Sequence, residues 1–107
     1  MGYFPLPLKL LFPLGRIVLS PAAESLGIDL MRFIRRHQTG DWGDLCDDDR
    51  AANQLALETN EAILSQYRVT SPTGVDETVS VMTESDRSMT ILLLSDEPME
   101  SPMITDF

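Results

Sequence analysis

The residues best suited to chemistry gather in one short stretch, His37 to Asn53. It contains the only histidine, the only tryptophan and the only cysteine of the chain, together with five aspartates. Imidazole, thiol and carboxylate groups can bind metal ions or move protons, so a catalytic or metal site is the first possibility to weigh. The residues concerned are His37, Asp41, Trp42, Asp44, Cys46, Asp47, Asp48 and Asp49.

The spacing of these residues does not complete a metal site. The chain has no Cys-x-x-Cys pair and no pair of histidines, as zinc sites usually require. The aspartates lack the alternating ladder, the central glycine and the terminal glutamate of a calcium loop. The favoured interpretation is a histidine at the end of one helix and acids at the start of the next. We expect no metal and no other cofactor.

Two catalytic pairings are also conceivable. Cys46 and His37 could act as nucleophile and base, but neighbouring carboxylates disfavour the thiolate, so we reject this pairing. Asp86 and Arg87 could form a dyad on a hairpin. Such a pair is more often a solvated turn, or an arginine that reaches back to a carboxylate such as Asp41.

Trp42 lies in an irregular loop between Gly40-Asp41 and Gly43-Asp44. In a protein this small so much apolar area is usually buried, so a core position is the preferred interpretation. An exposed tryptophan in a loop could instead anchor an interface with a partner. Both interpretations stay open from the sequence.

The charge of the chain limits its partners. The sequence has 107 residues, enough for one domain with one modest core, and carries 17 Asp and Glu against 8 Lys and Arg. A net charge of −9 is repelled by phosphate backbones and argues against direct nucleic-acid binding. It favours a basic protein surface. A single cysteine excludes an internal disulfide and fits the cytoplasm.

The two ends differ from the middle in composition. Residues 1–14 are apolar and rich in proline, without the basic start of a signal peptide or the length of a membrane span. They are interpreted as an arm that packs on the domain or on a partner. Residues 15–95 are expected to form a single domain. Residues 96–107 are acidic and interrupted by prolines, and we expect this tail to be disordered.

Two main helices are predicted. Ser20 and Pro21 open a helical turn, and the first main helix follows over residues 28–37. The second helix begins at Asp47 as N-cap, runs to about Glu58 and ends at Asn60 in a left-handed cap. The expected buried stripes are Leu30, Phe33, Ile34 and His37 in the first helix, and Ala52, Leu55, Ala56 and Thr59 in the second.

The rest of the chain is predicted to be β structure. A short strand covers residues 16–19, and three strands over residues 61–69, 78–83 and 89–94 form an antiparallel meander. The predicted fold is therefore α+β, with two main helices packed on one face of a three- to four-stranded antiparallel sheet. The expected core comprises Leu30, Phe33, Ile34, Leu55, Ile63, Tyr67, Val79, Val81, Ile91 and Leu93.

Ordered blocks of sequence resemble a known family. They are the run from His37 to Leu45 (HQTGDWGDL), the run from Asp49 to Asn53 (DRAAN), Ile63 to Tyr67 (ILSQY), and Thr83 to Ser88 (TESDRS). Together they resemble a family of small uncharacterised proteins carried on plasmids and integrative elements, some of them labelled as type I restriction subunits. The resemblance covers about residues 14–94. It implies an origin in a mobile genetic element, and it supplies no catalytic signature.

Two hypotheses of function follow. The first is a non-enzymatic inhibitor of anti-CRISPR or anti-restriction type, which blocks a host defence nucleoprotein complex by occupying its basic nucleic-acid-binding surface. The alternative is a small enzyme or ligand-binding module whose site uses His37, Asp41, Trp42 and Arg87. The partner-binding residues expected under the first hypothesis are Asp41, Trp42, Asp44, Asp47, Asp48 and Asp49.

Overall fold

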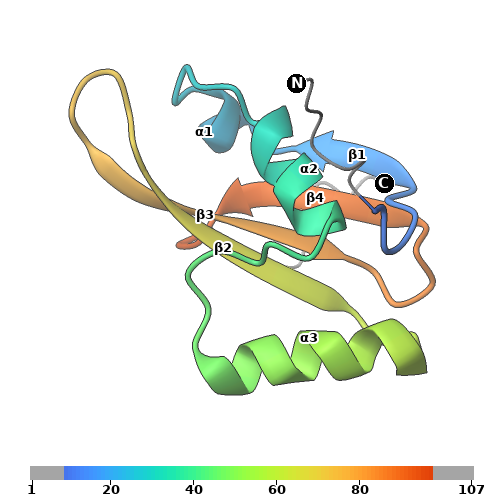
Figure 1. Cartoon of the computed structure of the whole chain (residues 1–107). Coiled ribbons are helices and arrows are strands. Elements are labelled where there is room, and N and C mark those ends of the chain that lie inside the picture. Colours follow the sequence, from blue (N-terminus) through green and yellow to red (C-terminus); the bar gives the residue numbers. More distant parts are fainter. Residues whose placement is uncertain (1–8, 98–107) are drawn as a thin grey trace, which may run out of the picture.

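An open four-stranded sheet carries the helices of this protein (Figure 1). The structure, a computed structural model, describes residues 9–97. Its strands follow the order β1-β4-β3-β2 across the sheet, and the α+β class is confirmed. The elements are β1 (Arg16–Leu19), α1 (Pro21–Glu24), α2 (Met31–Gln38), α3 (Asp47–Thr59), β2 (Ile63–Thr70), β3 (Asp76–Thr83) and β4 (Met89–Leu94).

The predicted meander is confirmed, but the sheet is mixed. Strands β2, β3 and β4 pair antiparallel, with Ile63 opposite Thr83 and Val79 opposite Leu94. Strand β1 pairs parallel to β4, so the prediction of an all-antiparallel sheet is wrong for this strand. The meander leaves one side of β4 open, and the N-terminal strand fills it in the parallel direction. Local alternation in the sequence carries no information about that direction.

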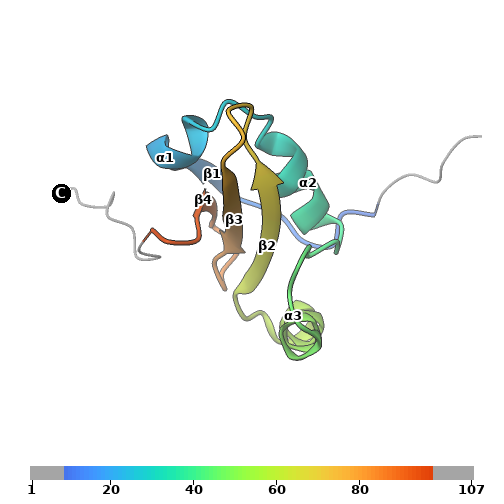
Figure 2. The ribbon, with the colours of Figure 1, turned by 90° about the vertical axis from the view of Figure 1, so that its left-hand side faces the viewer.

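Helix α2 packs on the inner face of the sheet. Ser20 accepts a hydrogen bond from the amide of Ala23 and Pro21 opens α1, as predicted. Helix α2 begins at Met31, later than the predicted start at residue 28. Its stripe is confirmed because Leu30, Phe33, Ile34 and His37 are all buried. Figure 2 shows this helix beside the sheet and on the same side as α3.

Helix α3 lies along the outer edge of β2 and not over the face of the sheet (Figure 1). Its N-cap is Cys46, which makes no side-chain cap bond, so the prediction that Asp47 is the cap is wrong. Asp47 is instead the first helical residue. Asn60 does end the helix in the left-handed conformation, with φ of 60° and ψ of 44°.

The buried side of α3 also differs from the prediction. Leu55 is 59% exposed, and Ala52 and Thr59 are exposed as well. The helix instead buries Asn53 and Ala56. This rotation brings the side chain of Asn53 to the backbone of β2, a requirement that an apolar stripe cannot predict.

The core has two parts. The larger cluster joins α2 to the inner face of the sheet through residues such as Phe33, Ile34 and Leu92. The smaller cluster lies under α3. Every predicted core residue except Leu55 is buried. The smaller cluster consists of Phe12, Trp42, Leu45, Ala56 and Ile63.

The described parts of the two ends are attached to the domain. The amide of Leu11 donates to the carbonyl of Gln38, whose side chain donates back to the carbonyl of Phe12. At the other end Glu97 accepts hydrogen bonds from the Ser20 hydroxyl and the Leu94 amide. Most of the predicted arm and tail, residues 1–8 and 98–107, lies outside the described residues. Within residues 9–97 no helix has the length and apolar character needed to cross a membrane.

Candidate functional site

His37 sits at the centre of a buried chain of hydroxyl groups. Its Nδ1 lies 2.6 Å from the Ser65 hydroxyl of β2, and its Nε2 lies 2.9 Å from the Thr83 hydroxyl of β3. The Thr83 hydroxyl lies 2.7 Å from that of Thr90, which donates to the carbonyl of Leu14 at 2.8 Å. This series of hydrogen bonds links α2, the strands β2, β3 and β4, and the N-terminal arm through the His37 imidazole.

The number of hydrogen atoms that each group can donate fixes the direction of every hydrogen bond in this series. A carbonyl only accepts, so the single hydroxyl hydrogen of Thr90 goes to Leu14. Thr90 must then accept from Thr83, and Thr83 must accept from Nε2–H of His37. The unprotonated Nδ1 accepts from Ser65. His37 is therefore held as the neutral Nε2–H tautomer.

Burial keeps His37 neutral and away from substrates. Its side chain is 0% exposed, and Ser65, Thr83 and Thr90 are buried to the same degree. Burial lowers the pKa of His37 to about 4, and the nearby Arg87 guanidinium acts in the same direction. The pairing of Ser65 with His37 has the distance of a nucleophile and base, but a fully buried pair has no room for a substrate. The imidazole is a structural junction.

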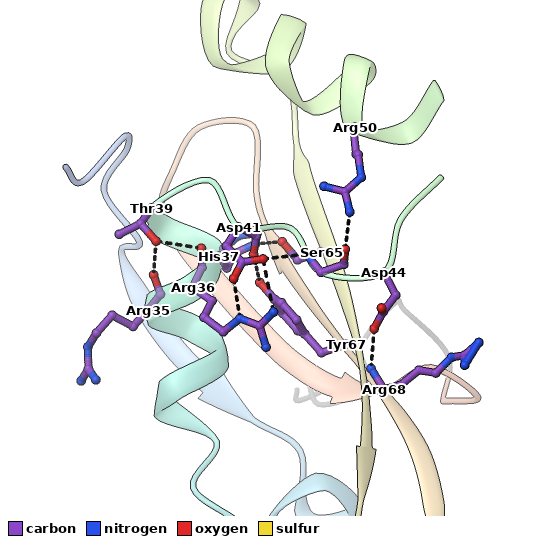
Figure 3. A network of polar contacts seen from close by, with 11 residues as sticks. Arg35, Arg36, His37, Thr39, Asp41, Asp44, Arg50, Ser65, Tyr67 and Arg68 are labelled. Carbon is purple, nitrogen blue, oxygen red and sulfur yellow. Dashed lines mark hydrogen bonds and ion pairs between the residues drawn. The ribbon is translucent and has the colours of Figure 1, made fainter. Parts of the chain in front are cut away.

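Asp41 is paired within the molecule. Arg36 of α2 donates to it through Nε at 2.7 Å and through a terminal nitrogen at 3.2 Å. The hydrogen bond from Arg36 lowers the pKa of Asp41, and the amide of Gly43 also donates to it at 3.3 Å. The Arg36 guanidinium lies over the ring of Tyr67, whose hydroxyl donates to the backbone carbonyl of Asp41 at 2.6 Å. Figure 3 shows this group together with His37.

Trp42 is a core residue, as the preferred interpretation held. It is 5% exposed and packs in the smaller cluster. Its indole nitrogen is buried and has no hydrogen-bond partner among the described residues. A side chain in this position can contact a partner only after the loop opens.

The loop that follows Trp42 closes the outer edge of β2. The carbonyl of Trp42 accepts from the amide of Gln66, and the amide of Asp44 donates to the carbonyl of Gln66 at 2.7 Å. The Asp44 carboxylate then accepts from the amide of Arg68 at 2.9 Å. Gly43 has φ of 76°, and a Cβ there would overlap the carbonyl oxygen of Gln66. The second Gly-Asp step of the motif therefore serves close backbone approach.

Helix α3 extends this closure along β2. Asn53 donates to the carbonyl of Leu64 at 2.6 Å and accepts from its amide at 3.1 Å. Arg50, which points from α3 toward the loop in Figure 3, ties the helix to the loop by donating to the carbonyls of Leu45 and Gly43. The blocks of sequence around Asp44 and Asn53 thus share one structural task, which is to occupy the free backbone groups of β2.

Arg87 is also used internally. It has φ of 60° in the hairpin between β3 and β4, and its guanidinium donates to the carbonyls of Ala56, Glu61, Glu84 and Ser85. Two of these carbonyls belong to the end of α3 and the residues just after it. Arg87 therefore caps α3 and does not reach a carboxylate, in contrast to one of the interpretations offered by the sequence.

The remaining residues of the motif face solvent. Cys46, Asp47, Asp48 and Asp49 are exposed. No hydrogen bond or ion pair from the three carboxylates is present among residues 9–97. Over the same residues there is no group of three or more His, Cys, Asp or Glu side chains that could hold a metal ion. Of the expected partner-binding residues, only these three aspartates are both exposed and uncommitted.

Sequence reasoning missed Ser65, Thr83, Thr90 and Asn53. Ser65 stands between Ile63 and Tyr67 on the inward side of β2, and a polar residue at such a position indicates a buried partner. That signal was present in the sequence. It could not name His37 as the partner, because 28 residues separate the two.

No family model, curated protein or solved structure matches this chain.

Proposed function

We propose that this protein is a non-enzymatic inhibitor of anti-defence type, carried by a mobile genetic element and acting in the cytoplasm. It binds a basic, nucleic-acid-reading surface of a host defence nucleoprotein complex. The observation that carries the proposal is the set of three adjacent carboxylates, Asp47, Asp48 and Asp49, exposed in the first turn of α3. Carboxylates without internal partners are available to the arginines that normally contact phosphate.

The position of α3 supports this use. The helix forms one border of the molecule, and its first turn follows directly on the loop that covers β2 (Figure 1). Asn53 and Arg50 fix the helix to the sheet edge and the loop, so the carboxylates are held on a rigid element. A rigid acidic turn loses little conformational entropy on binding.

The positively charged side chains of this protein gather away from α3, which favours one orientation of a basic partner. Lys9, Arg32, Arg35 and Arg36 line a groove beside α2, together with Asp41. A basic partner is repelled from that groove and attracted to α3. We therefore assign partner binding to Asp47, Asp48 and Asp49, with Asp44 at the border, and assign Asp41 and Trp42 to the support of the loop.

The alternative function, a small enzyme or ligand-binding module that uses His37, Asp41, Trp42 and Arg87, has less support. His37 and Trp42 are buried, and Asp41 is engaged by Arg36. Arg87 donates to backbone carbonyls. These contacts stabilise the fold, and of the four residues only Asp41 lines a groove, where Arg36 already neutralises it.

The test is a comparison of two charge-matched triple variants. Asp47→Lys, Asp48→Lys and Asp49→Lys together reverse the α3 turn. Glu24→Lys, Asp29→Lys and Glu58→Lys change the net charge equally at other exposed sites. Both proteins, and the parent, are used to capture partners from host lysate at low and high salt.

The expected result is a basic nucleic-acid-binding protein captured by the parent and the control but not by the α3 variant. Short duplex DNA or RNA should displace it, and capture should weaken with salt because exposed charges are screened beyond about 8 Å at physiological ionic strength. Circular dichroism checks the fold, and an Asp→Asn version of the α3 triple serves if lysines weaken the helix start. Equal capture by all three proteins would rule out the acidic turn as the interface.

A further inference from the structure

The two edge strands of the sheet, β2 and β1, differ in how far their outward backbone groups are hydrogen-bonded. The outward-facing backbone groups of β2 are occupied from Leu64 to the amide of Arg68, by Asn53 at Leu64, by the loop at Gln66 and by Asp44 at Arg68. At the opposite edge, β1 pairs only with β4. Figure 1 shows β1 bordering the sheet on the side away from α3.

The hydrogen bonds of β1 identify the groups that point outward. The amides of Arg16 and Ser20 donate to the carbonyls of Ser88 and Leu92 in β4. In a parallel ladder alternate residues bond to the same neighbour, so Ile17 and Leu19 direct their amides and carbonyls away from the sheet. No described residue bonds to these outward groups. Unpaired strand groups of this kind are a template for another strand.

Within residues 9–97 the chain turns inward at both ends of β1, and none of these residues pairs with its outer edge. Before it, Gly15 with φ of 65° packs its backbone against Ser88, where a Cβ would overlap the carbonyl group. After it, α1 folds over β4 and buries Ala23 in the larger cluster. Between the two turns the side chain of Ile17 is 37% exposed, as an apolar residue on an open edge.

We propose that β1 is a self-association edge, which pairs antiparallel with β1 of a second copy of this chain about a twofold axis at Val18. The pairing places Ile17 of one copy opposite Leu19 of the other. Both outward amides and both outward carbonyls of each strand are then bonded, and the two sheets become continuous. Ile17 and Leu19 meet on the inner side, and the two Val18 side chains meet on the outer side.

The same register brings complementary charges together. Arg16 of one copy lies beside Ser20 of the other, because the pairing is symmetric about Val18. The Ser20 hydroxyl already holds the Glu97 carboxylate at 2.8 Å. The exposed Arg16 side chain is therefore within reach of Glu97 of the second copy, and the twofold axis creates this ion pair twice.

Part of the negative charge lies far from this pairing. The chain has a net charge of −9, but the acidic first turn of α3 belongs to the opposite border of the sheet (Figure 1). Strand β1 itself carries one charge, the positive Arg16. Residues Asp47 to Asp49 stay exposed in the pair, so self-association through β1 is independent of the inhibitor function proposed above.

Sedimentation equilibrium of the full chain tests the proposal. The parent should pass from monomer to dimer with concentration, without larger species, because a twofold pairing closes. Ile17→Pro deletes an outward amide and leaves the bonds to β4 intact, so it should remain monomeric. Ile17→Thr keeps the amide and serves as the matched control, and it should still dimerise.

A charge exchange provides a second test that does not depend on proline. Arg16→Glu, which exchanges the positive charge for a negative one, should weaken dimerisation by about tenfold or more, whereas Arg16→Lys, which keeps the charge, should not. Arg68→Glu, an exposed change on the closed edge, should have no effect. If Ile17→Pro lacks the circular dichroism of the parent, the charge exchange decides.

Hydrogen exchange gives a third readout without any substitution. The amides of Ile17 and Leu19 should become protected as the concentration rises, whereas those of Leu64 and Gln66 should be protected at every concentration. A parent that stays monomeric at millimolar concentration would overturn the proposal. So would a dimer that persists unchanged in both Ile17→Pro and Arg16→Glu.

Discussion

Asn53 and Leu64 form a two-point contact between a side chain and a strand backbone. The side-chain Nδ2 of Asn53 donates to the Leu64 carbonyl at 2.6 Å, and the side-chain Oδ1 accepts from the backbone amide of Leu64 at 3.1 Å. Asn53 is buried, so the pair behaves like one rung of a further β-strand supplied by a helix. The contact explains why α3 lies along an edge and which of its sides faces inward.

Replacement of Asn53 should therefore be costly. Asn53→Ala leaves both Leu64 groups without their partners, and a loss of about 1–3 kcal/mol in the free energy of unfolding is expected from chemical denaturation. Asn53→Asp keeps the acceptor but places a buried carboxylate oxygen against the Leu64 carbonyl, so it should be at least as costly. The neighbouring exposed residue provides the control, and Gln54→Ala should change stability by no more than about 0.5 kcal/mol. Equal effects at the two positions would contradict the contact.

Gly43→Ala should destabilise the protein more than Gly74→Ala. Both glycines have positive φ, of 76° and 86°, so alanine is strained at each by about 1–2 kcal/mol. At Gly74 the added Cβ meets open space, whereas at Gly43 it overlaps Gln66 and approaches the Tyr67 ring at 2.5 Å. The difference between the two thermal midpoints isolates the steric part. A Gly43→Ala protein as stable as Gly74→Ala would show that the loop does not lie so close to β2.

The stability of the fold should fall as the pH drops from about 6.5 to about 4, because of His37. The pKa of His37 is lowered to about 4 in the fold, chiefly by burial. Above pH 6.5 His37 is unprotonated in both the folded and the unfolded protein. Between pH 6.5 and pH 4 only the unfolded protein binds a proton at His37, so protonation stabilises the unfolded state and lowers the free energy of unfolding. The full effect is about 3 kcal/mol. Urea denaturation of the parent and of His37→Gln at several pH values measures this effect. The free energy of unfolding should depend less on pH in the variant.

Nuclear magnetic resonance offers a direct check on the same group. The His37 ring signals should titrate near pH 4, with Nε2 protonated at neutral pH. Titration at the ordinary value of about 6.5 would show that the imidazole is open to water.

The packing of α2 and α3 predicts that truncation to alanine is costly for stability at Ile34 and nearly neutral at Leu55. Ile34 is 1% exposed in the larger cluster, and Leu55 is 59% exposed on α3. Ile34→Ala should lower the free energy of unfolding by about 2–5 kcal/mol. Leu55→Ala should change it by no more than about 0.5 kcal/mol, since alanine favours a helix and little area is lost. A large effect at Leu55 would place that residue in an interface.

The sequence by itself determined the local elements. The stripe through Phe33 and Ile34 and the alternation through Ile63 and Tyr67 record which side of each element meets the core. The C-terminal end of α3 is equally local, because the left-handed conformation of Asn60 follows from its own side chain and position. Such signals need only a few neighbouring residues, which is why these predictions are confirmed.

Only the tertiary structure decided what the rare residues do. His37 bonds to Ser65 and Thr83, which lie 28 and 46 residues away in the chain, so its spacing to nearby acids was uninformative. The parallel direction of β1 and the orientation of α3 were decided in the same way. The physical reason is that buried polar groups must find partners wherever the fold brings them. For that reason Asn53 took the inward position that apolar periodicity had predicted for Leu55.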